Sequence, residues 1–233
     1  MLYKWLNCVQ CLLYPPTCLL CQAGGTRDLD ICDACVTTLP KIHHSCKRCA
    51  LPLSSSSGDV CGNCQQNLPY YDAALAPFYY TFPIDRLLQR LKFHGTLSSA
   101  RLLGNLMADC LLQWRVELPD CILPVPLHYR RLKARGFNQS LELARFIGRR
   151  LNIPLDAQSV NRIKHTRPQM ELSLELRRRN IGGAFEVCQA FHWQHVAIVD
   201  DVMTTGSTVN ELARTLRWAG VTRIQVWSCA RTA

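Results

Sequence analysis

The sequence lacks any stretch near the ~18 uninterrupted apolar residues that a membrane-spanning helix needs, so we expect no membrane span. It also lacks a convincing signal peptide. In residues 1–21 only Lys4 precedes the apolar part, Pro15-Pro16 break it, and no small-x-small cleavage site follows. Disorder is excluded, because 48% of the residues are hydrophobic. These absences predict a globular protein of the cytoplasm.

Acidic residues are scarce, with 17 Asp and Glu against 27 Lys and Arg, which gives a net charge of +10. The excess is uneven, because residues 1–72 hold five basic and five acidic side chains and are neutral. Residues 130–179 alone hold 13 basic and four acidic side chains. A solvated helix face explains any one of these cations but not the cluster, which favours a polyanion or a pyrophosphate as partner.

Cysteine, in contrast, is abundant: ten of the 14 cysteines form five C-x-x-C pairs before residue 65. In a secreted protein such pairs indicate disulfides, but without a signal peptide metal thiolates explain them better. Cysteine and excess charge thus lie in different parts of the chain. We therefore predict a cysteine-rich double zinc-binding module over residues 1–70 and a second domain over residues 71–233.

Each C-x-x-C pair presents two thiolates on one tight turn, and two pairs complete a tetrahedral zinc site. Loops of 10 and 11 residues between neighbouring pairs suit zinc ribbons. Interleaved pairing stays open at this point, an iron–sulfur cluster is the minor alternative, and Cys8 and Cys11 have no assigned role. We assign one Zn²⁺ to Cys18, Cys21, Cys32 and Cys35, and a second Zn²⁺ to Cys46, Cys49, Cys61 and Cys64.

Strand and helix patterns alternate in the rest of the chain. Apolar residues at a spacing of three to four indicate helices, and short runs rich in β-branched residues indicate buried strands. Such alternation requires crossover connections, so we predict an α/β fold with a mainly parallel sheet. The expected strands cover residues 69–80, 121–126, 195–201 and 223–230, and the expected helices cover 84–93, 97–114, 139–151 and 207–219.

The most specific motif is VAIVDDVMTTGST at residues 196–208. An apolar strand ends in Asp200 and Asp201, at the sheet edge where open α/β folds bind ligands. The hydroxyls that follow can donate to phosphate oxygens, and Gly206 lets the backbone approach an anion at the start of a helix. The carboxylates repel phosphate and suit ribose hydroxyls, directly or through Mg²⁺. An Asp-Asp pair that only caps a helix leaves these hydroxyls unexplained.

This segment resembles the phosphoribosyl pyrophosphate (PRPP) motif of type I phosphoribosyltransferases. The resemblance implies a type I phosphoribosyltransferase-like parallel sheet flanked by helices, with Asp200 and Asp201 as the catalytic pair on the ribose diol. It further implies that Mg²⁺ binds with the pyrophosphate and that catalysis is largely positioning and charge stabilisation. The residues implied to cradle the 5′-phosphate are Thr204, Thr205, Gly206, Ser207 and Thr208.

Two further segments, PVPLHYRRLKARGFNQS (124–140) and HTRPQMELSLELRRRNIGGAF (165–185), resemble the ComF family, which includes the GntX DNA-utilisation proteins. With the cysteine pairs and the PRPP motif, the resemblance covers almost the whole chain. Packing and helix capping are the alternative for Phe137 and Asn138. The resemblance places Arg131, Arg135, Gly136, Phe137, Asn138 and Gln139 on the pyrophosphate side of the pocket, and Thr166, Gln169, Arg177 and Asn180 in a loop above it.

Two functions follow from these resemblances. The ComF likeness implies handling of imported DNA, in natural transformation or in the use of DNA as a nutrient. Single-stranded DNA and DNA-processing proteins would then meet the zinc module and the basic surface, with Phe137 and Tyr129 as candidate stacking groups and strong salt dependence. The alternative is an active phosphoribosyltransferase of nucleotide metabolism. The intact motif favours binding of PRPP or a nucleotide, but the sequence contains no recognisable base-binding element.

Overall fold

The computed structural model describes residues 16–25, 29–54, 58–164, 182–189 and 191–233. Within these ranges no helix is long and apolar enough to cross a membrane. Several predictions concern positions outside the described residues, namely those for Cys8, Cys11, Thr166, Gln169, Arg177 and Asn180.

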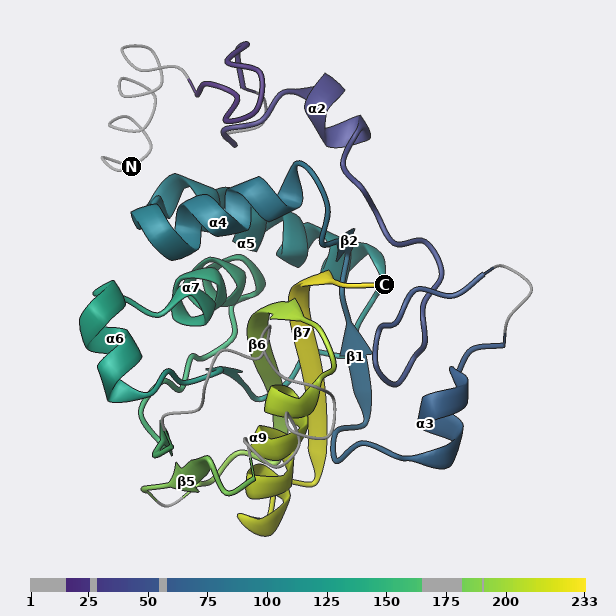
Figure 1. Ribbon diagram of the computed structural model, residues 1–233, viewed down its shortest axis with the longest axis vertical. Helices are drawn as coiled ribbons and strands as arrows, with labels where there is room; N and C mark the ends of the chain where they lie inside the picture. The colour runs from purple at the N-terminus through teal and green to yellow at the C-terminus, as the bar shows by residue number, and fades with distance from the viewer. Residues whose placement is uncertain (1–15, 26–28, 55–57, 165–181, 190) are drawn as a thin grey trace.

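A parallel sheet forms the centre of the molecule (Figure 1). Its strand order is β1–β7–β6–β3, and β2 also pairs with β7. Every pair in this sheet is parallel, and connections that contain helices lead from β2 to β3, from β3 to β6 and from β6 to β7. Its strands are β1 (Ala73–Leu75), β2 (Phe78–Tyr79), β3 (Cys121–Pro124), β6 (His195–Met203) and β7 (Arg223–Arg231). A separate antiparallel pair consists of β4 (Val160–Arg162) and β5 (Phe185–Val187).

Helices cover both faces of the sheet. Successive side chains of a strand point to opposite faces, so one strand contributes apolar residues to both cores. From β6, Ala197 and Val199 enter a core shared with α4, α5 and α7. Val196 and Ile198 enter a second core shared with α9. The helices are α4 (Ile84–His94), α5 (Leu97–Gln113), α6 (Tyr129–Arg135), α7 (Gln139–Leu151) and α9 (Ser207–Trp218).

The cysteine-rich region packs against both faces of this domain. Its first lobe (residues 16–39), with α2 (Asp33–Thr37), buries Cys18 and Ile31 in the core of α4 and α5. Its second lobe (residues 41–68), with α3 (Gly62–Gln66), buries Ala50 in the core of α9. In Figure 1 the first lobe lies beyond α4, whereas the second lies beside β1. Both lobes therefore share a hydrophobic core with the sheet.

The structure confirms the expected parallel α/β fold and most of its elements. The helices expected over 84–93, 139–151 and 207–219 are α4, α7 and α9. The single strand expected over 69–80 is wrong, because it is divided into β1 and β2, with Pro77, which has no backbone N–H, between them. Apolar periodicity did not indicate α6, since this short helix buries none of its residues.

Candidate functional site

Two adjacent carboxylates lie at the carboxyl end of β6. Asp201 is only 4% exposed, and Asp200 is partly buried. The backbone N–H of Asp201 donates to Asp200 Oδ1 at 3.0 Å. Burial raises the pKa of Asp200 to about 7, and the nearby charge of Asp201 adds to this effect while Lys92 opposes it. Two carboxyl groups held together with little water are costly, which is typical of a functional site.

The first turn of α7 holds this pair on one side. Ser140 Oγ donates to Asp200 Oδ1 at 3.1 Å, and Gln139 Nε2 lies 3.5 Å from Asp201 Oδ1. Arg135 donates to the other end of the Gln139 amide, at Oε1. The structure therefore connects Arg135 of the R-G-F-N-Q segment to the carboxylates through Gln139.

Two residues of the same segment have structural roles. Asn138 Oδ1 accepts a hydrogen bond from the Ser140 backbone N–H at 3.0 Å and so caps α7. Its Nδ2 donates to the Val125 carbonyl at 3.0 Å, which fixes the helix start to the end of β3. Phe137 packs, partly buried, against the core of α4, α5 and α7. For both residues the structure supports packing and capping.

A lysine of α4 also contacts the pair. Lys92 Nζ forms an ion pair with Asp201 Oδ2. Burial lowers the pKa of Lys92, but the attraction of Asp201 and Asp200 outweighs burial, so its pKa lies above the usual value. Lys92 thus offsets one of the two negative charges. Sequence reasoning missed it, because a cation on an amphipathic helix carries no local motif.

Three arginines lie near the carboxylates or near one another, namely Arg162, Arg131 and Arg135. Burial lowers the pKa of Arg162 to about 10, with Arg131 lowering it further and Asp200 raising it. Burial and the charge of Arg135 lower the pKa of Arg131. Positive charges that lie close together in this way are stabilised when an anion binds among them. Arg162 lies on β4, 5.6 Å from the centroid of the Phe185 ring, and the sequence marked it only as one of many cations.

The loop between β6 and α9 contains the predicted phosphate-binding hydroxyls. Gly206 has a φ of +74°, and a Cβ there would lie 2.7 Å from Met203 Cε, so both conformation and space favour glycine. Thr205 Oγ1 lies 2.7 Å from Ser207 Oγ and accepts the Ser207 backbone N–H at 3.3 Å. Hydroxyls gathered at the N-terminus of a 12-residue helix form a suitable anion site.

Eight cysteines form two clusters in the order that their spacing predicted. Within each cluster the four Sγ atoms lie within 4.8 Å of one another. The Cys21–Cys32 and Cys49–Cys61 Sγ distances are 3.6 and 3.7 Å. Sulfurs of a tetrahedral zinc site lie about 3.8 Å apart, given Zn–S bonds of about 2.3 Å. Sequential pairing is confirmed, and the interleaved alternative is wrong. The clusters are Cys18, Cys21, Cys32, Cys35 and Cys46, Cys49, Cys61, Cys64.

Backbone N–H donors prepare one thiolate in each cluster. Burial raises the pKa of Cys18, but N–H donors of Cys21, Cys32 and Leu20 outweigh it and lower the pKa to about 6. The same competition lowers the pKa of Cys46 to about 7. One of its donors is the Cys61 N–H, which lies 3.3 Å from Cys46 Sγ. Since Zn²⁺ binds thiolates, both clusters suit this metal.

Comparison with known proteins identifies the zinc module and the family of the chain. The model of the double zinc ribbon domain matches residues 9–68. Competence protein F of Haemophilus influenzae is 37% identical over 208 residues, which are 86% of this chain and 90% of that protein. The chain belongs to the ComF family. DNA utilization protein YhgH of Salmonella typhimurium, another relative of this ComF protein, is 36% identical over 95% of this chain and 99% of its own. The two clusters are therefore the Cys₄ zinc-binding sites of the ribbon module.

Among solved structures, the ComF chain is similar to a glutamine PRPP amidotransferase of B. subtilis complexed with ADP and GMP. The TM-score is 0.37 at 20% identity, over 55% of this chain and 25% of that chain. A purine phosphoribosyltransferase of Pyrococcus horikoshii matches with a TM-score of 0.32 at 19% identity, over 57% of this chain and 82% of that one.

Proposed function

We propose that this ComF protein binds PRPP at the end of β6 and handles imported DNA. One observation supports the PRPP assignment: a carboxylate pair, with Asp201 buried and Asp200 partly buried, adjoins both a hydroxyl-rich loop at a helix N-terminus and a group of arginines. A ligand with a diol at its centre and a phosphate group at each end matches this order. PRPP has that arrangement, and the motif at residues 196–208 resembles the PRPP motif.

Each part of the site then has a role in binding. Asp200 and Asp201 accept hydrogen bonds from the ribose hydroxyls. Loop 204–208 donates hydroxyl and backbone N–H groups to the 5′-phosphate. Arg131 and Arg135 offset the charge of the pyrophosphate, which carries Mg²⁺ with it as part of the ligand. Arg162 joins this set in our proposal, because its pKa responds to both Arg131 and Asp200.

Two neighbours prepare the carboxylates for this task. Ser140 donates to Asp200 and fixes the direction of its free lone pairs. Lys92 pairs with Asp201 and holds that carboxylate in place. With these contacts already made, the pair pays little reorganisation energy when a ribose binds.

The DNA role rests on the family and on charge. Relatives carry the names competence protein F and DNA utilization protein. Tyr129 on α6 is 63% exposed, and the guanidinium of Arg130 lies 5.8 Å from its ring centroid. An exposed aromatic ring beside cations suits stacking with bases of single-stranded DNA and pairing with its phosphates. We propose that the basic surface and the zinc module make these contacts in the cytoplasm, with DNA-processing proteins as further partners.

The second candidate is an active phosphoribosyltransferase. The pKa of Asp200, about 7, favours it, because a carboxyl group that titrates near neutrality can exchange protons with a base or amine acceptor. For both candidate functions we propose the same two parts: residues 1–70 bind zinc, and residues 71–233 bind PRPP.

One experiment separates the candidates. PRPP binding and pyrophosphate release are measured with and without single-stranded DNA, for the wild type and Asp200→Asn/Asp201→Asn. We expect PRPP binding in the wild type and a large loss in the variant. Pyrophosphate release with an acceptor supports the transferase, whereas binding without release supports PRPP as a regulator of DNA handling. An absence of PRPP binding by the wild type refutes the PRPP assignment altogether. If the affinity for single-stranded DNA does not change with salt concentration, the proposed electrostatic contact with DNA is refuted.

A further inference from the structure

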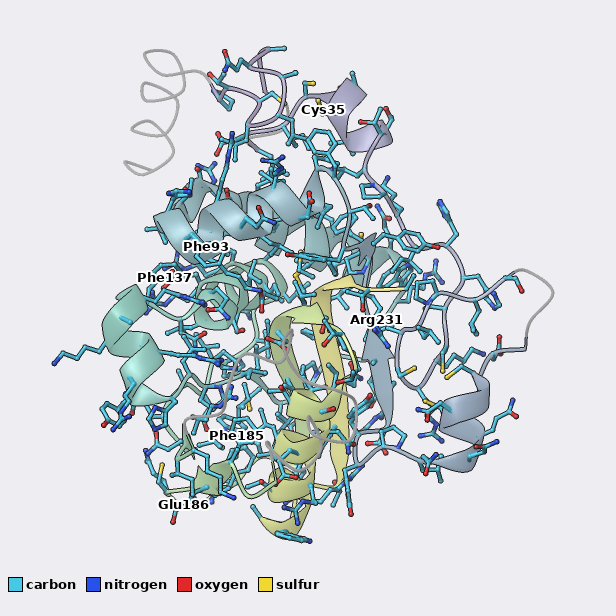
Figure 2. All side chains as sticks on the ribbon, in the orientation of Figure 1. Cys35, Phe93, Phe137, Phe185, Glu186 and Arg231 are labelled. Atoms are coloured by element: carbon cyan, nitrogen blue, oxygen red, sulfur yellow. The ribbon has the colours of Figure 1, made fainter. Side chains whose placement is uncertain are left out.

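A single buried arginine joins the second zinc site to the proposed phosphate loop. Arg231 is the last residue of β7 (Figure 2). Its side chain is buried, with 6% exposed. Its Nε donates to the backbone carbonyl of Cys49, a ligand in the second cysteine cluster, at 3.1 Å. Its Nη1 donates to the carbonyl of Met203 at 3.1 Å and to the carbonyl of Thr204. One rigid guanidinium therefore holds a zinc-binding turn and the start of loop 204–208.

Packing reinforces this connection. Tyr71 is 3% exposed, and its Oη would lie 3.3 Å from a Cβ at Gly206. Cys49, Tyr71 and Met203 belong to the same hydrophobic core. A cleft of about 390 Å³ is lined both by Cys61 and Cys64 of the zinc site and by Thr205, Gly206 and Ser207 of the loop. The zinc ligands and the phosphate loop are thus the two walls of one small space.

The chemistry of the guanidinium makes the two walls interdependent. Its five N–H donors have a fixed planar geometry, so they cannot follow one carbonyl without leaving another. A buried N–H that loses its acceptor is costly. When the cysteine cluster loses its metal and the Cys49 carbonyl moves, Arg231 must shift or leave a donor unpaired. Either response disturbs the carbonyls that position loop 204–208.

We propose that Arg231 is a positioning residue that couples Zn²⁺ at the second site to phosphate binding at loop 204–208. The proposal rests on the proposed PRPP site and adds regulation to it: loss of the second zinc weakens binding of the ligand's 5′-phosphate. By linkage, the 5′-phosphate must strengthen zinc binding by the same factor. The first zinc site packs into the opposite core and serves as an internal control.

The main test compares two small probes on the full-length, zinc-loaded protein. Ribose 5-phosphate reports on loop 204–208, and pyrophosphate reports on Arg131 and Arg135. Calorimetry of Arg231→Gln should give a Kd for ribose 5-phosphate that is ~10-fold higher, with the Kd for pyrophosphate within ~2-fold of the wild type. The matched control is Arg217→Gln. Arg217 also holds backbone carbonyls, those of Tyr70 and Val221, and should leave both constants within ~2-fold.

A second measurement reads the coupling from the metal side. Zinc affinity is measured by chelator competition with and without saturating ribose 5-phosphate. In the wild type one zinc equivalent should bind ~10-fold more tightly with the probe, while the other is unchanged. In Arg231→Gln this difference should disappear. If Arg231→Gln does not fold, the wild-type measurement alone decides between coupling and no coupling.

The possible failures are distinct. If the wild type binds neither ribose 5-phosphate nor PRPP, the proposed function itself is wrong. If the wild type binds both but zinc affinity is unaffected by ribose 5-phosphate, the coupling is refuted and the proposed function stands. Equal weakening of both probes in Arg231→Gln, or an equal loss in Arg217→Gln, indicates general structural damage and also overturns the positioning role.

Discussion

Replacing Asp200 by asparagine should stabilise the folded protein while it weakens PRPP binding. Asparagine keeps the oxygen that accepts the Ser140 hydroxyl and the Asp201 backbone N–H. It removes a negative charge that the fold holds at a cost, since burial and Asp201 raise the pKa of Asp200 from 3.8 to about 7. A side chain that destabilises the fold but serves the ligand is typical of a binding site.

The size of the effect follows from the shift in pKa. The folded state holds the Asp200 proton more tightly than the unfolded state. The contribution of the protonated carboxyl to stability is therefore complete below about pH 4 and is lost as the pH rises through about 7. At pH 8 the ionised carboxylate therefore destabilises the wild type by at most about 4 kcal/mol. Asp200→Asn should recover part of this energy at pH 8, less than half as much at pH 5, and little near pH 4.

The assay is urea denaturation of the zinc-loaded wild type and Asp200→Asn at several pH values. The difference in free energy of unfolding should grow from pH 5 to pH 8, while the Kd for PRPP at pH 8 increases. Asp156→Asn is the control of opposite sign. Hydrogen bonds from Ser159, Gln158 and Trp193 outweigh burial and lower the pKa of Asp156, so this variant should lose stability. An Asp200→Asn variant that is less stable than the wild type at pH 8, or a difference independent of pH, refutes the reasoning.

Three further predictions concern single parts of the site. Lys92→Met leaves Asp201 buried without its ion-pair partner, so urea denaturation at pH 8 should show a free energy of unfolding lower by about 3 kcal/mol. Lys92→Arg keeps the ion pair and should lose less. Arg162→Gln should raise the Kd for pyrophosphate by ~10-fold in calorimetry, because charge-assisted contacts contribute about 1.5 kcal/mol or more. The Kd for ribose 5-phosphate should not change. Equal effects on both probes would contradict the assignment of Arg162 to the pyrophosphate. Mass spectrometry of the native protein should find two zinc equivalents, and their removal by a chelator should abolish cooperative unfolding of both lobes; a metal-free protein with an unchanged unfolding curve would contradict the structural role of zinc.

The features that sequence predicted are those set by neighbouring residues. The segment at residues 196–208 contains its strand, its carboxylates, its loop and its helix start in one run, so local patterns identify all four. The cysteine clusters follow from the spacing of C-x-x-C pairs, because each pair occupies one turn. For Asn138 the sequence allowed two roles, lining the pocket or capping a helix, and the structure supports the cap.

The features that sequence did not predict depend on contacts between distant segments. Lys92 reaches Asp201 from a helix more than a hundred positions earlier, and Arg231 reaches Cys49 across 182 positions. Both residues look like ordinary cations within their own elements. The segregation of cysteine and charge indicates two functional parts, but it gives no sign that the two lobes fill opposite cores. Tertiary packing alone determines these pairings.

The most direct test of the PRPP site is calorimetric titration with PRPP and Mg²⁺ of the full-length wild type and of Asp200→Asn/Asp201→Asn. We predict saturable binding with one PRPP per chain in the wild type and competition by ribose 5-phosphate. The double variant loses two charge-assisted contacts, so its affinity should be lower by ~100-fold. A wild type that gives no binding heat, or a double variant that binds PRPP as tightly as the wild type, would contradict this prediction.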